Sequence, residues 1–339
     1  MYEKINVGES CRRILEDNGG LIADKARIIL LEDPALKDLR PPLEFISKNW
    51  RDLTPALMRL SCEAVEGRPD ETNDAAVATC LMNLSFYIWD DIIDNARFRS
   101  FKPTLFGKFG EGTALIIGGL ASAKAFSILN EMPMDKEKRQ IISKLVWDLW
   151  TKIAQGETVA LRLRSKENSS LRKKFWKIKT EAADLETCLK IGAIIGGGSE
   201  SEINHLGKYG LYLGTILELS KDFRISINLT AELAEKIRNE TLPYSILWAS
   251  QRSKSIREKL DLAIKNPIEQ TCIKKIVQDM LATKALDHIA RNIKRCTKKA
   301  RDELISMKIN NATRTLQSFI DAQPRLFIES LSMFQAQES

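Results

Sequence analysis

Apolar residues recur at spacings of three and four along almost the whole chain of 339 residues, with charged residues between them. This spacing places the apolar side chains on one face of an α-helix. Strict alternation of apolar and polar residues, the pattern of a half-buried strand, is absent, and so is any hairpin signal flanked by such alternation. The sequence therefore predicts an all-α fold.

Proline and glycine fall between the predicted helices, where helices are expected to end. The clearest breaks are Asp33-Pro34, Gly67–Pro69, Met132-Pro133 and Gly196–Gly198. No linker rich in Pro, Gly or Ser divides the chain, and no internal repeat is visible. We therefore expect residues 1–339 to form a single domain of about a dozen helices, since a mean helix has about 11–12 residues.

The composition excludes several kinds of site. Lys and Arg (52) exceed Asp and Glu (45), which gives a net charge of +7. These basic residues are spread along the predicted helices, as on solvated helix faces, so nucleic acid is not an expected partner. Only two histidines occur, His205 and His288, which argues against a His-rich zinc site and a Ser-His-Asp triad.

Several features of the sequence point to the cytoplasm. The six cysteines contain no C-x-x-C pair, which favours reduced thiols, mostly in the core, over a disulfide framework. Residues Met1–Gly8 lack the apolar stretch of a signal peptide. The longest apolar run, Ala114–Ala121, is far shorter than a membrane span. We expect a cytoplasmic protein without a membrane span.

A cluster of aspartates ends an apolar predicted helix, in the segment Trp89-Asp90-Asp91-Ile92-Ile93-Asp94. Asp90 and Asp94 share one helix face, with Cβ atoms about 5–6 Å apart, and Asp91 points roughly 100° away. Carboxylates at this range repel each other. Mg²⁺ ions that bridge them to a substrate phosphate would remove the repulsion. On this motif alone, a solvated acidic helix end remains an equal alternative.

The residues that follow extend the pattern. From Asp90 the chain reads DDIIDNARFRSFKPTLFGKFG, which resembles the D-D-x-x-D, R-R-G-x-P-T and F-G motifs of the trans-isoprenyl diphosphate synthase (polyprenyl synthetase) family. This family lies within the class I isoprenoid and terpene synthase superfamily. Further matches follow in the family's order at Gly156-Glu157, Lys179-Thr180, Tyr209–Gly214 and Thr241–Pro243. The resemblance covers residues 20 to 320 and identifies the chain as a divergent member.

The resemblance implies a helical bundle of the isoprenoid synthase type with a central active-site cavity. In that cavity, Mg²⁺ and basic side chains would hold an allylic prenyl diphosphate. Asp90 and Asp94 would be metal ligands, and Asp91 would be a neighbouring catalytic carboxylate. Arg99 and Lys179 would bind the diphosphate. A homodimer is also implied by the family.

Further roles follow from the same resemblance. Thr180 would hydrogen-bond to the diphosphate beside Lys179. Phe86, Tyr87 and Trp89 would line the cavity, with Phe86 capping it near a short or medium prenyl chain. For Trp147, Trp150, Trp176 and Trp248, ordinary core packing is the better interpretation.

The chain departs from the family at the pocket for a second substrate, isopentenyl diphosphate. Arg51 could replace the Lys of the family's G-K-x-x-R segment, but Thr54 stands where that segment has Arg. Asn83 replaces a Gln or His, Ser100 replaces an Arg, and Phe101 replaces a Gly. Each lost charge-assisted bond is worth about 1.5–3 kcal/mol. The substitutions therefore predict that this pocket is lost or repurposed.

The second metal motif also deviates. Of its aspartates only Asp222 remains, and Lys221 stands at the first position. Glu218, Asp222 and Ser226 follow at spacings of four, as the metal ligands of class I terpene cyclases do. Two interpretations stay open: Glu218 and Asp222 bind metal, or the face is merely polar, with Glu218 paired to Lys221. Lys221 and Arg224 could also neutralise the diphosphate directly.

Three functions are compatible with these motifs. The leading hypothesis is a Mg²⁺-dependent terpene synthase, which ionises an allylic prenyl diphosphate and then cyclises or deprotonates the cation. The alternative is a prenyltransferase, which elongates the allylic diphosphate or prenylates a non-isoprenoid acceptor. A third possibility is a non-catalytic subunit of a prenyl synthase, although the retained aspartates argue against it.

Overall fold

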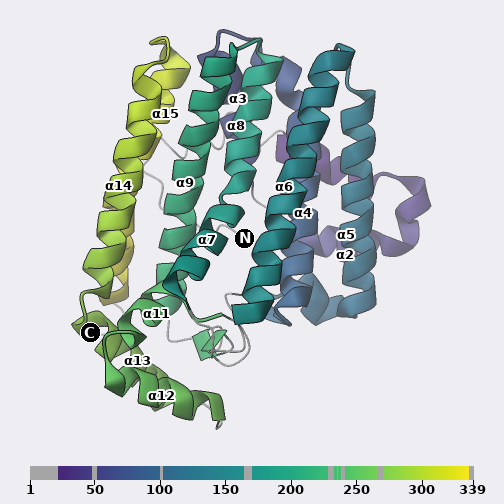
Figure 1. The fold of residues 1–339 in the computed structure, drawn as a ribbon. Coiled ribbons are helices and arrows are strands. Elements are labelled where there is room, and N and C mark those ends of the chain that lie inside the picture. The colour runs from purple at the N-terminus through teal and green to yellow at the C-terminus, as the bar shows by residue number, and fades with distance from the viewer. Residues whose placement is uncertain are drawn as a thin grey trace. The chain divides into compact units, whose positions relative to one another are not determined.

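A computed structural model describes residues 22–47, 52–99, 102–163, 170–227, 233–234, 236–237, 241–265 and 270–335. Nearly all of these residues are helical, as Figure 1 shows, and the predicted all-α class is confirmed. Residues 22–31 are helical. They are followed, before residue 132, by η1 (Pro34–Leu39), α2 (Arg40–Ser47), α3 (Thr54–Ala64), η2 (Pro69–Thr72), α4 (Asn73–Ile93), β1 (Phe98–Arg99), β2 (Lys102–Pro103) and α5 (Leu105–Glu131).

The remaining helices are α6 (Lys136–Leu163), α7 (Leu171–Glu181), α8 (Ala183–Ile195), α9 (Glu200–Ile227), α11 (Tyr244–Ser250), α12 (Lys254–Lys265), α13 (Gln270–Ala282), α14 (Ala285–Ile305) and α15 (Asn311–Gln335). The chain divides into two compact units. Unit 1 comprises Met1–Leu149, Asp184–Gly210 and Glu303–Phe319, and unit 2 comprises Trp150–Ala183, Leu211–Asp302 and Ile320–Ser339. The single domain expected over residues 1–339 stays a prediction.

In unit 1, α4 is the central helix. From Ala75 to Ile88 it is mostly apolar on all sides and is buried almost throughout, as expected of a helix without a continuous polar face. It packs along α5 and against α3. Helices α3 and α8 also meet closely, because a Cβ on Gly192 would lie 2.2 Å from the backbone oxygen of Met58.

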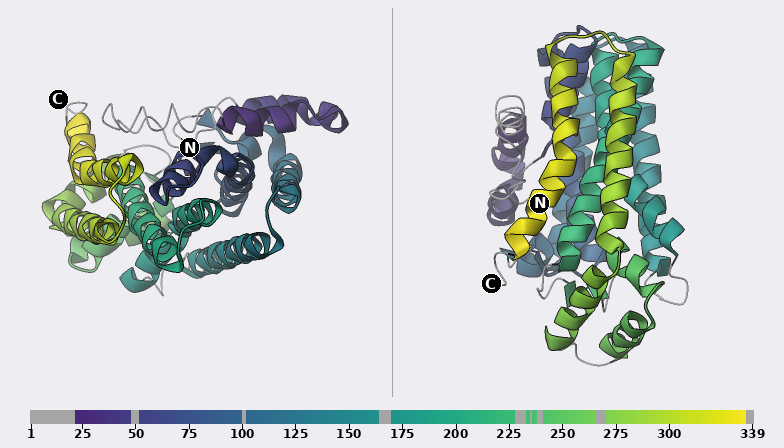
Figure 2. Two further views of the ribbon diagram at one scale, coloured as in Figure 1. Left: turned by 90° about the horizontal axis from the view of Figure 1, so that it is seen from above. Right: turned by 90° about the vertical axis from the view of Figure 1, so that its left-hand side faces the viewer.

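In unit 2, the helices near the C-terminus are amphipathic and bury one stripe each. On α14 this stripe contains Ile289, Ile293, Cys296 and Ala300, at spacings of four, three and four. Helices α11, α12 and α13 contact one another and are visible in the right-hand view of Figure 2. Phe223 of α9 packs edge-on against Phe327 of α15, with ring centroids 5.4 Å apart.

A short antiparallel hairpin was not predicted. Strands β1 and β2 pair Phe98 with Pro103 and Arg99 with Lys102. Strands of two residues are too short to show alternation, so the sequence carried no signal for them. Thr104 follows the hairpin as the N-cap of α5, where its side chain accepts a hydrogen bond from the Gly107 N–H at 2.9 Å.

The tryptophan predictions were partly wrong. Trp248 is buried, with 7% of its surface exposed, but Trp147 and Trp176 are 70% and 40% exposed. Trp147 lies between Val146 and Leu149 of α6, both of which are buried, so it faces the opposite side of the helix. The cysteines agree with expectation, since those in the described ranges are free thiols, mostly buried.

Two segments are long and apolar enough to cross a membrane, Pro69–Ile93 and Leu105–Glu131. Within their most apolar windows, 67% and 39% of the residues are buried inside the protein. The first segment contains α4, whose burial is that of a core helix. Length and composition alone are weak evidence for a span.

Candidate active site

Helix α4 carries the first aspartate cluster at its C-terminal end. Asp90 and Asp91 occupy the last turn, and Asp94 is the C-cap residue, with its backbone N–H donating to the Asp90 carbonyl at 2.8 Å. Helical geometry therefore continues through Asp94. Asp90 and Asp94 share one face, as their spacing predicts.

Arg99 connects this helix end to the hairpin. Its Nη2 donates to Asp90 Oδ2 at 2.7 Å, and its Nε donates to Asp91. Burial raises the pKa of the Asp91 carboxyl, while Arg99 lowers it and Asp90 raises it further. The guanidinium thus offsets the repulsion between the two carboxylates, a contact that the sequence did not predict.

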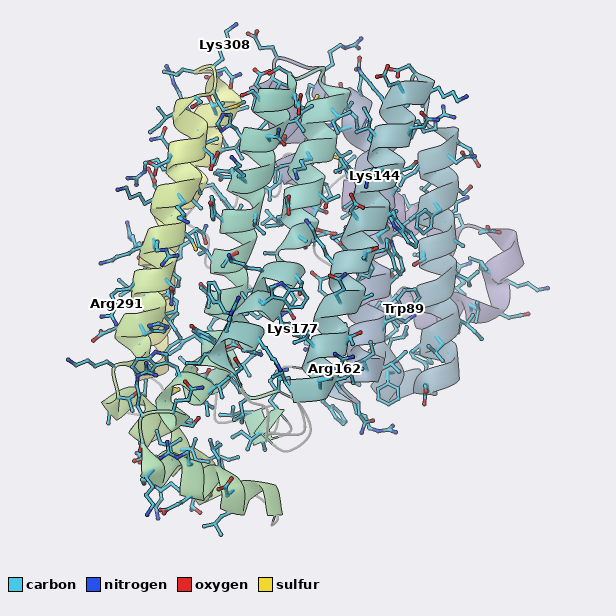
Figure 3. All side chains as sticks on the ribbon, in the orientation of Figure 1. Trp89, Lys144, Arg162, Lys177, Arg291 and Lys308 are labelled. Carbon is cyan, nitrogen blue, oxygen red and sulfur yellow. The ribbon has the colours of Figure 1, made fainter. Side chains whose placement is uncertain are left out.

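The aromatic residues before the aspartates are half-buried. Trp89, labelled in Figure 3, lies against α5, where a Cβ on Gly118 would come within 2.5 Å of its Nε1. Ser85 donates to the Gly118 carbonyl at 2.8 Å, one turn earlier on α4. These contacts fix the position of the helix end that carries the aspartates. The predicted cavity role of Phe86 and Tyr87 stays a prediction.

The residues expected at the second substrate pocket form a closed network. Asp52 accepts hydrogen bonds from the Thr54 N–H and hydroxyl, both at 2.8 Å, and from Asn83 Nδ2 at 3.0 Å. Thr54 and Asn83 are buried. Burial raises the pKa of Asp52 despite these hydrogen bonds. The other substituted positions, Arg51, Ser100 and Phe101, lie outside the described residues.

In unit 2, Lys177 of α7 lies between two carboxylates. Its Nζ is 2.8 Å from Glu157 and 2.8 Å from Glu181, and its side chain is 8% exposed. Burial raises the pKa of Glu181, but Lys177, Lys221 and Lys174 outweigh this effect and lower it overall. Sequence reasoning missed Lys177, although its spacing of four from Glu181 is the signal of an ion pair on one helix.

The second aspartate-rich segment belongs to the same cluster. Lys221 Nζ lies 3.2 Å from Glu218. This is the ion pair expected if the segment is a polar helix face. Lys174 Nζ lies 3.3 Å from Asp222, which also accepts the Tyr244 N–H at 2.6 Å. Burial raises the pKa of Glu218 in spite of Lys221. Both carboxylates proposed as metal ligands therefore have lysine partners here. Arg224 is half-buried on the same helix.

The predicted diphosphate ligands Lys179 and Thr180 point to different surroundings. Thr180 is buried against Gly156, where an added Cβ would lie 2.2 Å from its hydroxyl oxygen, and it donates to the Lys177 carbonyl. Lys179 is exposed, with its Nζ 5.6 Å from the centre of the Phe175 ring, and it lines a surface pocket. The roles predicted for both remain untested.

The chemistry of the donors decides whether magnesium fits. In the part of the chain that the structure describes, no three His, Cys, Asp or Glu side chains are arranged to hold a metal ion by themselves. Mg²⁺ that binds with a diphosphate, however, typically takes only one or two carboxylates and completes its shell with phosphate oxygens and water. Asp90 and Asp94, one turn apart at a partly exposed helix end, fit that requirement.

Comparisons with known proteins identify relatives of this chain. The profile of a family described as polyprenyl synthetase matches residues 39–281. A putative geranylgeranyl pyrophosphate synthase 8, chloroplastic, from Arabidopsis thaliana is 31% identical over 249 residues, which is 67% of this chain and 69% of that protein.

Solved structures show the same fold. A geranylgeranyl pyrophosphate synthetase from Pyrococcus horikoshii superposes with a TM-score of 0.80 at 21% identity, over 95% of this chain and 99% of that one. A polyprenyl synthase from Caulobacter crescentus, complexed with calcium and isoprenyl diphosphate, superposes with a TM-score of 0.81 at 18% identity, over 96% of this chain and 98% of that one. The predicted isoprenoid synthase fold is confirmed.

Proposed function

The chain belongs to the polyprenyl synthetase family, and on that premise we propose that it is a prenyltransferase that acts on allylic prenyl diphosphates. The observation that most directly supports this proposal is the arrangement of Asp90, Asp91 and Arg99 at the end of the closely packed helix α4. The relatives are named as synthases of prenyl diphosphates. This supports the prenyltransferase alternative over the terpene synthase that was the leading hypothesis.

In the proposed reaction, the bond between C1 of the allylic group and the diphosphate oxygen breaks, and the diphosphate leaves with the electron pair. The allylic carbon then forms a carbon–carbon bond with the acceptor, which loses a proton. Mg²⁺, when bound, would stabilise the negative charge of the departing diphosphate. Asp90 and Asp94 would hold the metal.

The residues of the chain itself would orient the substrate. A guanidinium has five N–H donors, so Arg99 can hold Asp90 and Asp91 and also contact phosphate oxygens. The close contact between Trp89 of α4 and Gly118 of α5 fixes the end of α4, and with it the position of Asp90 and Asp91. In unit 2, Glu218 and Asp222 remain candidate metal ligands. Each is paired with a lysine, however, and this favours a different role, in which the two carboxylates position Lys221 and Lys174 to bind an anion.

One observation keeps the terpene synthase as a second candidate. The network of Asp52, Thr54 and Asn83 places a carboxylate where the family resemblance leads one to expect cations for isopentenyl diphosphate. A reaction that needs one diphosphate, or that uses an acceptor without a diphosphate, is compatible with such a site.

A homodimer in the cytoplasm completes the proposal. Helices α5 and α6 expose large apolar side chains within unit 1, namely Leu115, Ile116, Phe126, Ile141 and Trp147. Surfaces of this kind are typical of interfaces between protein chains, and we propose a second copy of this chain as the partner. Light scattering of the purified protein should give twice the mass of one chain. In Trp147→Glu, which places a charge on this surface, the measured mass should fall towards that of one chain.

A single assay separates the candidate functions. Purified protein with Mg²⁺ is incubated with C10, C15 and C20 allylic diphosphates, each with and without isopentenyl diphosphate. Longer diphosphates formed only with isopentenyl diphosphate would support elongation, whereas hydrocarbon or alcohol formed without it would favour the terpene synthase. No turnover, with activity restored by a partner protein, would indicate a non-catalytic subunit.

Two variants test the residues. Asp90→Asn should abolish diphosphate release, because it removes a charged oxygen ligand. Asp74→Asn, an exposed aspartate in the first turn of the same helix, should leave release unchanged. Normal release by Asp90→Asn would remove Asp90 from the mechanism.

A further inference from the structure

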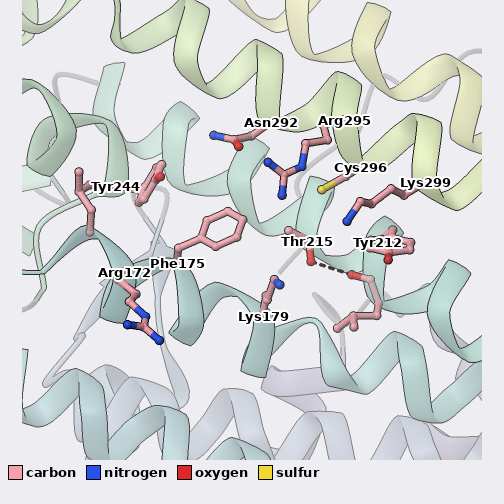
Figure 4. A pocket seen from close by; sticks show the side chains of 12 residues that line it. Arg172, Phe175, Lys179, Tyr212, Thr215, Tyr244, Asn292, Arg295, Cys296 and Lys299 are labelled. Atoms are coloured by element: carbon pink, nitrogen blue, oxygen red, sulfur yellow. Dashed lines mark hydrogen bonds between the residues drawn. The ribbon is translucent and has the colours of Figure 1, made fainter.

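A pocket of about 240 Å³ opens on unit 2, and Figure 4 shows the side chains that line it. Helices α7, α9, α11 and α14 all contribute to it. Its lining includes neither Asp90, Asp91 nor Asp94, and no other aspartate or glutamate.

Four cationic side chains are among the residues that line this pocket. Arg172 and Lys179 lie on α7, seven residues apart, and Arg295 and Lys299 lie on α14, four residues apart. Both spacings put the two residues of a pair on one helix face. In the described ranges of the chain, none of the four forms an ion pair with a carboxylate of the protein.

The remaining lining residues are neutral. Burial raises the pKa of the Cys296 thiol, although Arg295, Lys179 and Lys299 lower it in part. These three electrostatic interactions also show that charges from both helices surround one buried sulfur. Like charges held together repel one another, and nothing in the lining offsets the repulsion. A bound anion would do so.

The floor of the pocket is aromatic and apolar. Lys179 Nζ lies 5.6 Å from the Phe175 ring centre, and Lys299 Nζ lies 5.5 Å from that of Tyr212. Thr215 is buried beneath them and donates to the Leu211 carbonyl at 2.7 Å, as the dashed line in Figure 4 marks. A ligand with an anionic head and an apolar body matches this lining.

We propose that the pocket between α7 and α14 is a metal-independent binding site for a diphosphate, which Arg172, Lys179, Arg295 and Lys299 contact directly. Four positive charges suit the multiple negative charges of a diphosphate better than those of a monoanion. The diphosphate is either inorganic or the head group of a prenyl diphosphate, whose chain would lie on the aromatic floor. The proposal does not depend on the proposed function, and Lys179 is the one residue of the pocket that the sequence resemblance already implied as a diphosphate ligand.

The test measures binding by calorimetry in a magnesium-free buffer with a chelator. The protein carries Asp90→Asn and Asp94→Asn, so that binding through the first aspartate cluster is removed. Inorganic diphosphate, a C15 prenyl diphosphate and inorganic sulfate are titrated in turn. We expect the two diphosphates to bind and sulfate to bind much more weakly. Tighter binding of the prenyl diphosphate would identify the organic source, and equal binding the inorganic one.

Matched charge variants locate the site. Arg295→Gln with Lys299→Gln should weaken diphosphate binding about tenfold or more, because two charge-assisted contacts with the diphosphate are lost. Lys294→Gln with Lys298→Gln removes the same charge from exposed positions of α14 outside the pocket and should change affinity less than about twofold. Circular dichroism confirms that each variant is folded.

Two results would overturn the proposal: no diphosphate binding without metal, or equal weakening by both double variants. Its failure is distinguishable from that of the proposed function, because the turnover assay uses the unmodified chain with Mg²⁺. If the protein turns over substrate but binds no diphosphate without metal, only the proposed binding site is refuted. If it binds diphosphate without metal but shows no turnover, only the proposed prenyltransferase activity is refuted.

Discussion

Arg99 and Asp90 form an ion pair of 2.7 Å, although they lie nine residues apart and on different elements. The strand β1 brings the guanidinium back to the end of α4, where it also meets Asp91. The acidic cluster is therefore balanced by a cation of the chain itself. A metal ion that binds there must share these carboxylates with Arg99, and a diphosphate must share the Arg99 guanidinium with the carboxylates.

Arg99→Lys should lower kcat/KM for the allylic diphosphate about 10- to 100-fold. A lysine keeps the charge but cannot donate to both carboxylates in the planar geometry of a guanidinium. Arg97→Lys is the matched control, since exposed Arg97 stacks on Phe106 at 4.8 Å and contacts no aspartate of the cluster. Steady-state kinetics decide the matter, and equal activity in both variants would contradict the role given to Arg99.

Gly118→Ala should destabilise the protein by about 1–3 kcal/mol, the usual range for overpacking. Its new methyl group would meet Trp89 Nε1 at 2.5 Å. Gly119→Ala, the next residue of α5, has nothing within 4 Å of its added Cβ and should be neutral or stabilising by up to about 1 kcal/mol. Denaturant unfolding measures both. If the two variants were equally stable, the close α4–α5 contact would be wrong.

Lys177→Met should lower the free energy of unfolding by about 3–5 kcal/mol, because it leaves Glu157 and Glu181 without their shared cation. Lys173→Met changes an exposed lysine of the same helix and should stay within about 0.5 kcal/mol of the parent. Chemical denaturation compares them. A loss below about 1 kcal/mol in Lys177→Met would show that the cluster tolerates the missing charge.

Stability should fall as the pH is lowered from about 7.5 to about 5.5, partly because of His288. Burial first, and then Arg291 and Arg252, lower the pKa of His288 below 6.5. The unfolded chain therefore takes up this proton at a higher pH than the folded protein. The contribution of His288 is complete above pH 6.5 and is lost as the pH falls towards its folded-state pKa.

The geometry around His288 agrees with a neutral ring. Its Nε2 lies 3.0 Å from the Tyr244 hydroxyl and 3.1 Å from Asn292 Nδ2, which is a donor. Thermal unfolding midpoints across this pH range should show a flatter profile for His288→Gln than for the parent. An unchanged slope in His288→Gln would reject this explanation.

Local patterns predicted much of the molecule. The apolar spacing predicted the helices, and the spacing of Asp90 and Asp94 placed them on one face, because both follow from the geometry of a single helix. The partner of Arg99 was not predictable in this way, since it depends on a hairpin of two-residue strands. Trp147 was misjudged for a related reason: its exposure depends on which side of α6 meets its neighbours.

The lysines of α7 illustrate the same limit. Lys174 and Lys177 are buried, whereas Lys173 and Lys179 are exposed. All four have the same intrinsic helix propensity, so composition cannot distinguish them. The rotation of the helix against its neighbours decides which ones enter an ion-pair cluster and which ones line the pocket.

The network of Asp52, Thr54 and Asn83 also limits what a single substitution can do. A cation introduced at position 54 would lie beside the Asp52 carboxylate and would form an internal ion pair. A longer amide at position 83 would likewise lose or strain its bond to Asp52. Residues that share a partner do not act additively. The effect of a substitution at position 54 or 83 therefore depends on whether Asp52 is present, and this part of the chain is expected to respond to paired changes differently from single ones.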